Sequence, residues 1–303
     1  MSGLLAGSPL EKVASGAIWA EGPVWLPGRR AVRYSDVIGN RILEFSEATG
    51  ELTVYDAAAE HANGRTLDLD GAVVQCSHGR RAIERDDGVT TTTLVDHWRD
   101  RRLNSPNDVV VKSDGTIWFT DPSYGIQKAG EGHPGEVEYG DHVVFRFDPS
   151  TGDLDPVVID VLMPNGLAFS PDESVLYVAD SSLVPPDGRS DRLTGHAIHA
   201  YDVVDGRRAK NGRTFVEVSP GLPDGIRVDV HGNVWSSCED GVQVYSPDGE
   251  LVERIPVPEV VANLCFGGHD GTVLYITATS SLYRIATTTT DAVRLARSPR
   301  VPT

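Results

Sequence analysis

The chain has 303 residues, of which 44 are acidic and 27 are basic, so its net charge at pH 7 is −17. A surface this negative repels the phosphates of nucleic acids and argues against a nucleic-acid partner. Apolar residues make up 40% of the sequence, which is ample for a large core. No apolar run approaches the roughly 18 residues that a membrane-spanning helix needs.

The cysteines and the N-terminal residues indicate the cellular compartment of the protein. Cys76, Cys238 and Cys265 form no CxxC pair, which favours buried free thiols in a reducing compartment. The opening residues, MSGLLAGSPLEKV, lack the basic and apolar regions of a signal peptide. We therefore expect a cytoplasmic protein, either a monomer or a homodimer, that binds neither membranes nor nucleic acids.

Short runs rich in β-branched and aromatic residues follow one another along the chain, while helical periodicity is scarce. The clearest runs, in chain order, are RAVRYSD (30–36), AVVQCSH (72–78), TIWFTD (116–121), SVLYVAD (174–180), NVWSSCED (233–240) and TVLYITA (272–278). A third strand and a weaker fourth strand follow most of these runs. The pattern predicts six units of about four strands each.

An acidic or amide residue stands at the head of six apolar runs, and successive members lie 39 to 59 residues apart. These head residues are Glu21, Asn63, Asn107, Asn165, Asp224 and Asn263. A recurrence at this distance is typical of β-propellers, in which each repeat forms a four-stranded blade. We predict one all-β domain over residues 1–303, a six-bladed β-propeller with a central metal site and blades starting near residues 21, 63, 107, 165, 224 and 263. Either residues 11–19 or residues 291–296 would close the ring.

Equivalent positions in a closed ring converge on its axis, so the head residues are expected to meet there. The four strongest candidates for a metal site are Glu21, Asn107, Asn165 and Asp224. Two carboxylates balance the charge of a divalent cation, and the amides add oxygen ligands without further charge. Oxygen donors without sulfur or imidazole suit Ca²⁺, then Mg²⁺ or Mn²⁺.

An alternative interpretation is that the head residues only mark turns, because Asn-Gly and Asp-Gly are common turn sequences. This explanation is adequate for one site but weak for six matching positions. Asn63 and Asn263 are the two expected to be structural. Glu21 favours the metal interpretation, since Glu-Gly-Pro is not a preferred turn.

Two long insertions, residues 122–141 and 181–195, are expected on the same face as the head residues. In a blade the first strand leaves this face and the second returns to it, so the loop after the second strand lies beside the head of the first. Loops of this length are usually functional, which favours a lid or a substrate wall. The alternative is that they are merely tolerated insertions.

Several motifs together resemble the gluconolactonase group of the SMP-30/gluconolactonase/LRE-like family, over roughly residues 17–287. They are EGPVW (21–25), RLNSPNDVVV (102–111), FTDPSYG (119–125), PNGLAFSPDES (164–174), PDGIRVD (223–229) and VANLCFGG (261–268). The resemblance implies a six-bladed propeller that holds one divalent metal, commonly Ca²⁺ or Zn²⁺, in its channel and hydrolyses sugar lactones.

The resemblance also implies roles for individual residues. Glu21, Asn165 and Asp224 match the metal ligands of the family, and Asn107 matches an amide that contacts substrate or a ligand water. Asp224 matches the general base, and Asn104 is expected to face the substrate. Ser105 stands where animal members have a substrate-binding arginine, so their substrate contacts do not transfer.

From these residues we predict metal-dependent opening of an aldono-lactone such as glucono-1,5-lactone. One divalent ion is expected, with Ca²⁺ favoured over Zn²⁺, Mn²⁺ or Mg²⁺, and Asp121, Tyr124 and Tyr139 are expected to line the pocket. Because a carboxylate on a cation is a weak base, Asp224 could instead serve mainly as a ligand. Two alternative functions are a phosphotriesterase-like hydrolase and a non-catalytic binding propeller with a structural cation.

Overall fold

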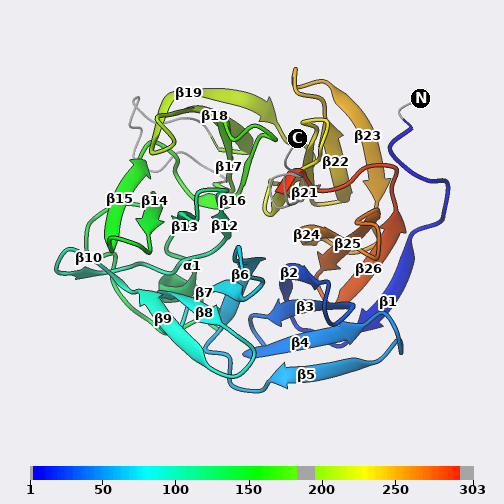
Figure 1. Cartoon of the computed structure of the whole chain (residues 1–303), viewed down its shortest axis with the longest axis horizontal. Coiled ribbons are helices and arrows are strands. Elements are labelled where there is room, and N and C mark those ends of the chain that lie inside the picture. Colours follow the sequence, from blue (N-terminus) through cyan, green and yellow to red (C-terminus); the bar gives the residue numbers. More distant parts are fainter. Residues whose placement is uncertain (1–2, 183–194, 294–303) are drawn as a thin grey trace, which may run out of the picture.

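The computed structural model describes residues 3–182 and 195–293. Six four-stranded antiparallel sheets stand around a central axis like the blades of a propeller (Figure 1). This confirms the predicted six-bladed all-β fold. No helix in the described ranges is long and apolar enough to cross a membrane.

The first three blades follow chain order from the innermost strand outward. Blade one contains β2 (Ala20–Leu26), β3 (Ala31–Asp36), β4 (Arg41–Ser46) and β5 (Leu52–Asp56). Blade two contains β6 (Ala62–Leu67), β7 (Val73–Ser77), β8 (Ala82–Asp86) and β9 (Thr91–Val95). Blade three contains β12 (Val109–Val111), β13 (Ile117–Asp121), β14 (Val143–Asp148) and β15 (Asp153–Val158).

The remaining blades repeat this order, with one exchange in the last. Blade four contains β16 (Pro164–Phe169), β17 (Val175–Asp180), β18 (Ala197–Val204) and β19 (Arg208–Glu217). Blade five contains β20 (Ile226–Val228), β21 (Val234–Cys238), β22 (Gly241–Tyr245) and β23 (Leu251–Pro256). Blade six contains β24 (Val261–Gly267), β25 (Val273–Ala278), β26 (Ser281–Ala286) and β1 (Glu11–Ser15).

The N-terminal strand closes the ring. β1 pairs antiparallel with β26 as the outermost strand of blade six, with Glu11 opposite Arg284 and Ser15 opposite Ser281. The sequence left two segments open for this role, and the structure places residues 11–15 there. Of the other segment, Asp291 forms an isolated bridge with Asp229 beside blade five, and residues 294–296 lie outside the described residues.

Two short elements lie between the blade strands. A two-stranded ribbon, β10 (His97–Trp98) and β11 (Arg101–Arg102), precedes blade three. One helical turn, α1 (Tyr124–Gln127), follows β13 within the long insertion at residues 122–141.

Large aromatic side chains recur where neighbouring blades pack. Trp118 of β13 meets Phe169 of β16 edge to face with ring centroids 5.2 Å apart. Trp235 of β21 meets Phe266 of β24 in the same way at 5.3 Å. In both pairs the second strand of one blade contacts the innermost strand of the next. Such contacts bury large apolar surfaces and fix how the blades sit around the axis.

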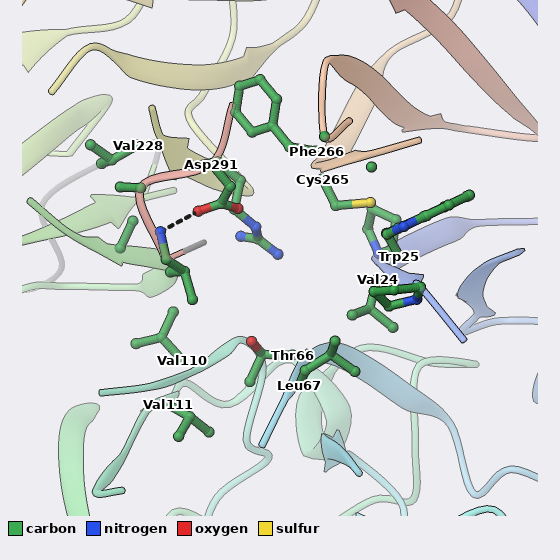
Figure 2. Close-up of a pocket in the computed structure, with 18 of the residues that line it drawn as sticks. Val24, Trp25, Thr66, Leu67, Val110, Val111, Val228, Cys265, Phe266 and Asp291 are labelled. Atoms are coloured by element: carbon green, nitrogen blue, oxygen red, sulfur yellow. Dashed lines mark hydrogen bonds between the residues drawn. The ribbon is translucent and has the colours of Figure 1, made fainter. Parts of the chain in front are cut away.

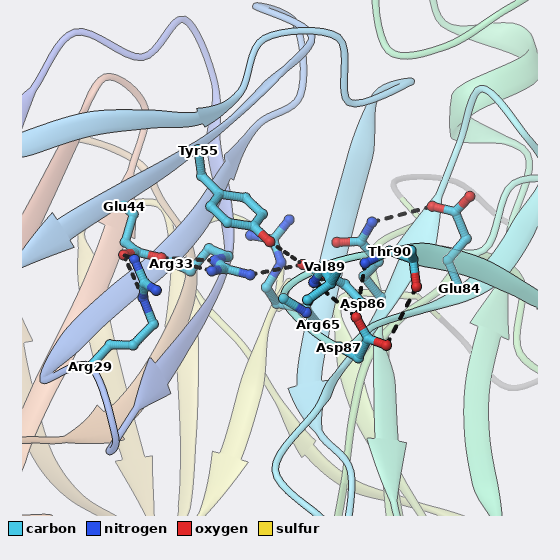
Figure 3. A network of polar contacts seen from close by, with 12 residues as sticks. Arg29, Arg33, Glu44, Tyr55, Arg65, Glu84, Asp86, Asp87, Val89 and Thr90 are labelled. Carbon is cyan, nitrogen blue, oxygen red and sulfur yellow. Dashed lines mark hydrogen bonds and ion pairs between the residues drawn. The ribbon is translucent and has the colours of Figure 1, made fainter.

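Blades one and two are joined by a buried polar network (Figure 3). The guanidinium of Arg33 donates to the Glu44 carboxylate at 2.8 and 3.0 Å and to Asp86 at 2.9 Å. Its carbon atom lies 3.3 Å from the ring centroid of Tyr55, whose hydroxyl also donates to Asp86. Arg33 therefore satisfies two buried carboxylates at once.

We expect Arg33→Leu to lower the free energy of unfolding by about 3–5 kcal/mol, because it removes the buried counter-charge of Asp86 and leaves Glu44 only the exposed Arg29. Arg29→Leu is a matched control: Arg29 pairs with the same Glu44, but its side chain is 61% exposed. Its loss should cost at most about 1 kcal/mol. Urea unfolding measures both values, and equal losses would contradict the assignment.

Candidate active site at the channel mouth

The head residues gather at one end of the central channel. Glu21, Asn63, Asn107, Asn165 and Asn263 are buried, and Asp224 is partly exposed. Four of the innermost strands change register at their heads: between Glu21 and Val24, Ala62 and Arg65, Pro164 and Leu167, and Val261 and Asn263. Such bulges re-aim side chains. The local irregularity that turns these side chains toward the axis is thus repeated around the ring.

Glycine follows four of the head residues because the innermost strands approach one another closely there. A Cβ on Gly22 would lie 2.1 Å from the carbonyl oxygen of Asn63, and a Cβ on Gly166 would lie 2.3 Å from that of Asp224. Backbone hydrogen bonds bridge neighbouring strands at the same level: Gly64 to Asn107 at 2.8 Å, Gly166 to Asp224 at 3.0 Å, and Gly225 to Ala262 at 2.8 Å. We call this level the glycine constriction.

The glycine constriction replaces the tight-turn interpretation of the Asn-Gly and Asp-Gly pairs. Gly22, Gly64 and Gly166 lie inside strands β2, β6 and β16. Close approach of backbones, not a turn, is what excludes a side chain there.

Gly166→Ala is expected to lower both stability and activity. The added methyl group must displace Asp224, which is a form of overpacking that typically costs about 1–3 kcal/mol. Gly28→Ala is the control, since nothing lies within 4 Å of a Cβ built at Gly28. Thermal unfolding together with a turnover assay checks the prediction, and an unchanged Gly166→Ala protein would show that the strands can separate without cost.

Three of the four predicted metal ligands have side chains without hydrogen-bond partners among the described residues. Within the described ranges, no residue forms a hydrogen bond with the Asp224 carboxylate or with the side-chain amides of Asn107 and Asn165. The fourth, Glu21, accepts hydrogen bonds at one oxygen only, from Gly22 N at 2.7 Å and from Asn263 Nδ2 at 3.1 Å. The site therefore presents several oxygen atoms whose hydrogen-bonding capacity the protein itself does not use.

At both carboxylates of this site, burial outweighs the nearby positive charges of Arg227 and Lys128. Burial raises the pKa of Glu21 to about 7, and the nearby charge of Asp108 adds to the rise. Burial also raises the pKa of Asp224 well above its usual range, and the charge of Glu21 contributes. A divalent cation would relieve both effects, so the donor set fits such an ion.

The composition of the site limits how such an ion could be held. Among the described residues, no group of three or more His, Cys, Asp or Glu side chains is placed to hold a metal. Only Glu21 and Asp224 carry charge in the predicted set, and the amides of Asn107 and Asn165 would supply the other protein oxygens. Metal binding at the channel mouth stays a prediction.

The insertion at residues 122–141 packs over this face. Gly125 N donates to Ser105 Oγ at 2.9 Å, and the carbonyl oxygen of Glu131 lies 2.8 Å from His78 Nδ1. Tyr124 hydrogen-bonds to Ser181, and after burial the largest influence that raises its pKa is the charge of Asp224. Tyr124 therefore lies beside the channel mouth. Of the second insertion, residues 183–194 lie outside the described residues.

Asn104, Asp121 and Tyr139 form a cluster that braces this insertion. The side-chain amide of Asn104 donates to the carbonyl oxygens of Asp121 and Asp141 at 3.0 and 2.9 Å. One Asp121 oxygen accepts a hydrogen bond from Asn104 N at 2.8 Å and another from the Tyr139 hydroxyl. These contacts position the loop, and direct contact of the three side chains with substrate stays a prediction.

Sequence reasoning missed an ion pair next to the constriction. Arg227 Nη1 lies 3.5 Å from Asp108 Oδ2, and both side chains are buried. The sequence does contain one sign of this ion pair: Asp108 follows its head residue at the position where most other head residues are followed by glycine. Asn63 and Asn263, expected to be structural, hydrogen-bond to His78 and Glu21 respectively.

Comparison with known proteins identifies the family. The model of the SMP-30/Gluconolactonase/LRE-like region matches residues 19–280. A gluconolactonase of Zymomonas mobilis is 32% identical over 93% of this chain and 82% of its own length. A 6-deoxy-6-sulfogluconolactonase of Pseudomonas putida is 35% identical over 86% of this chain and 84% of its own length.

A solved structure agrees with these matches. The structure of a gluconolactonase from Xanthomonas campestris superposes with a TM-score of 0.86 at 38% identity, over 94% of this chain and 91% of that one. The match of the family model over most of the chain, together with these relatives, shows that the chain belongs to the SMP-30/gluconolactonase/LRE-like family.

Proposed function

We propose that this protein is a lactonase that opens the ring of an aldono-lactone by hydrolysis with the help of one divalent cation. The observation that carries the proposal is the cluster of unpaired oxygen donors at the channel mouth, formed by Asp224, Asn107 and Asn165 beside Glu21. Relatives with high coverage are named as lactonases for sugar acids, which supports the reaction class.

Glu21, Asn165 and Asp224 would hold the cation, and Asn107 would hold either the cation or the substrate beside it. Ca²⁺ suits these oxygen donors best, and Zn²⁺, Mn²⁺ and Mg²⁺ are the alternatives. When bound, the ion supplies positive charge for the oxyanion that develops on the lactone carbonyl.

The protein's own groups complete the chemistry. Asp224 is the candidate general base, because its carboxylate has no hydrogen-bond partner in the described chain and can accept a proton from water. Tyr124 lies beside Asp224 and can contact the hydroxyl groups of a sugar lactone. Asn104 holds residues 121–141 in place and so shapes the same face.

A panel of lactones tests the proposal directly. Glucono-1,5-lactone, pentonolactones, an uncharged aliphatic lactone and a phosphotriester are added to the purified protein, and acid release is followed with a pH indicator. Hydrolysis of the sugar lactones supports the proposal. Turnover of the phosphotriester alone, or a metal-loaded protein that hydrolyses none of them, would contradict it and favour one of the alternative functions.

The physiological lactone can be narrowed with the same assay. Relatives are named for gluconolactone, pentonolactone and a sulfonated gluconolactone, which differ in the number of carbon atoms and in the substituent at the far end of the sugar. The ratio of kcat/KM values across these three substrates measures which shape the pocket prefers.

A further inference from the structure

A cavity lies at the opposite end of the channel from the head residues. Its volume is about 560 Å³, within the range of small-molecule sites. Its walls come largely from residues three and four positions after the head residues on the same strands, such as Val24, Thr66, Val110 and Ala168. At about 3.3 Å per residue, these positions lie roughly 10–13 Å farther along the axis.

The glycine constriction stands between this cavity and the candidate active site. Gly22 and Gly64 follow the head residues and precede the cavity residues on β2 and β6, and the strands nearly touch there. Hence a molecule in the far cavity would not occupy the position of the lactone.

The walls of the far cavity are mostly apolar. Figure 2 shows the labelled side chains arranged around an open centre, with Val24 and Trp25 on one side and Val110 and Val228 on another. Phe266 and Leu67 complete much of the remaining wall. Surfaces of this kind bind the apolar part of a ligand and offer little to a polyhydroxylated sugar.

Two buried guanidinium groups line the same cavity. Arg65 is fully buried, and its Nε has no hydrogen-bond partner among the described residues. Its other nitrogens donate to the Gly22 carbonyl oxygen at 3.2 Å and to Ser35 Oγ at 2.7 Å. Burial lowers the pKa of Arg65 to about 9, so the side chain is still a cation at pH 7.

Arg227 also retains donors that the protein does not use. Its recorded partners, both at Nη1, are the Ile226 carbonyl oxygen at 2.6 Å and Asp108 at 3.5 Å. Within the described chain, Nε and Nη2 therefore have no acceptor. A ligand acceptor could take these donors in charge-assisted hydrogen bonds.

Acidic groups also lie at or next to this cavity. Glu173 lines the cavity but is held by Lys112 at 3.0 Å and by Ser113. Asp291 lies at one wall and accepts a hydrogen bond from Val293 N at 2.9 Å. Asp108 engages Arg227 at Nη1 only, so among the described residues Nε of Arg65 and two nitrogens of Arg227 are still available to a ligand.

We propose that the far cavity binds an amphipathic organic anion, with its carboxylate on Arg227 and Arg65 and its apolar body along the hydrophobic walls. A cation would meet two guanidinium groups, and a sugar would leave its hydroxyl groups unpaired. The charge-assisted hydrogen bonds orient the ligand, and the apolar body supplies most of the buried area.

Decanoate, 1-decanol and decyltrimethylammonium, all below their aggregation limits, are suitable probes of this site. They share an apolar chain of similar length and carry an anionic, a neutral and a cationic head group respectively. Isothermal titration calorimetry should show decanoate binding at least about tenfold more tightly than 1-decanol, with no binding of the cation. Equal binding of decanoate and decanol would overturn the assignment of the arginines.

Variants locate the site. Thr66→Trp places an indole in the cavity and should weaken decanoate binding at least about tenfold, whereas Thr92→Trp on the exposed strand β9 should leave it unchanged. Arg227→Met should remove the preference for decanoate over decanol even if Thr66→Trp fails to fold. Retained binding in Thr66→Trp would overturn the proposal.

Two further readouts separate this site from the lactonase site. Saturating gluconate should not displace decanoate, since competition would place decanoate at the head-residue mouth and overturn the proposal. The Thr66→Trp protein should keep its lactone turnover. Because decanoate binding and lactone turnover are measured independently, failure of one proposal is distinguishable from failure of the other.

Discussion

Replacing Asp224 with Asn is expected to lower kcat/KM for a sugar lactone by roughly 10²–10⁴-fold, the usual contribution of a general base. The reason is chemical, because an amide of the same shape cannot take a proton from water. The substitution should preserve the fold, since among the described residues none hydrogen-bonds to the Asp224 carboxylate. Steady-state kinetics on glucono-1,5-lactone measures the change.

Glu21→Gln distinguishes a ligand from a base. It should lower turnover and also reduce the metal content of the purified protein, because Glu21 supplies one of only two charges in the predicted ligand set. If Asp224→Asn loses turnover while retaining metal, Asp224 acts as the base. If both variants lose metal in parallel, Asp224 is mainly a ligand, and a second water carries the proton.

Asp248→Asn and Glu250→Gln are matched controls, since both residues are exposed in the turn between β22 and β23. They make the same chemical changes far from the channel and should retain normal kinetics. Near-normal rates in Asp224→Asn or Glu21→Gln would refute the role assigned to that residue.

The parts of this site that sequence predicted are the ones repeated in every blade. Glu21, Asn165 and Asp224 recur at blade spacing because each innermost strand must begin at the same level of the channel. The glycines after them recur as well; the alternative explanation from sequence was a turn, whereas the structure shows backbones in close approach. A turn and a close approach of backbones both favour glycine, and only the contacts between neighbouring blades in the structure show which of the two applies here.

What sequence did not predict depends on contacts made once in the fold. Sequence named residues 11–19 and 291–296 as alternatives for closing the ring but could not choose between them, because β1 pairs with residues about 270 positions away and no local pattern marks such a pair. Arg227 meets Asp108 across 119 positions, again without periodicity. The far cavity follows from the repeat only in hindsight, because Val24 and Val110 look like ordinary strand residues until the strands are placed around an axis.

Stripping the protein with EDTA is expected to abolish lactone hydrolysis and to lower Tm, with the largest fall at alkaline pH. A ligand that binds only the folded state stabilises it by mass action, about 2.7 kcal/mol at a concentration 100 times its Kd. Ca²⁺, Zn²⁺, Mn²⁺ and Mg²⁺ added back separately should restore both properties to different extents. The restored rates identify the cation that the site prefers.

The decrease in Tm on metal removal depends on pH because of the carboxyl groups of Glu21 and Asp224. In the metal-free protein the folded-state pKa of Glu21 is raised from 4.5 to about 7, so the folded state binds more protons than the unfolded state between these values. Stability is then highest at low pH and is lost as pH rises from about 4.5 to 7. Asp224 shifts in the same direction and adds to this loss.

The decisive quantity is the difference in Tm between loaded and stripped protein, measured from pH 5 to pH 8. Asp121 has a pKa raised to about 7 by burial, so it lowers stability with rising pH in both forms and cancels in the difference. The Tm difference that still increases with pH is therefore due to the carboxylates at the channel mouth, and Glu21→Gln should reduce that increase. A difference that stays flat, with hydrolysis unaffected by EDTA, would show that Glu21 and Asp224 are accommodated without a cation.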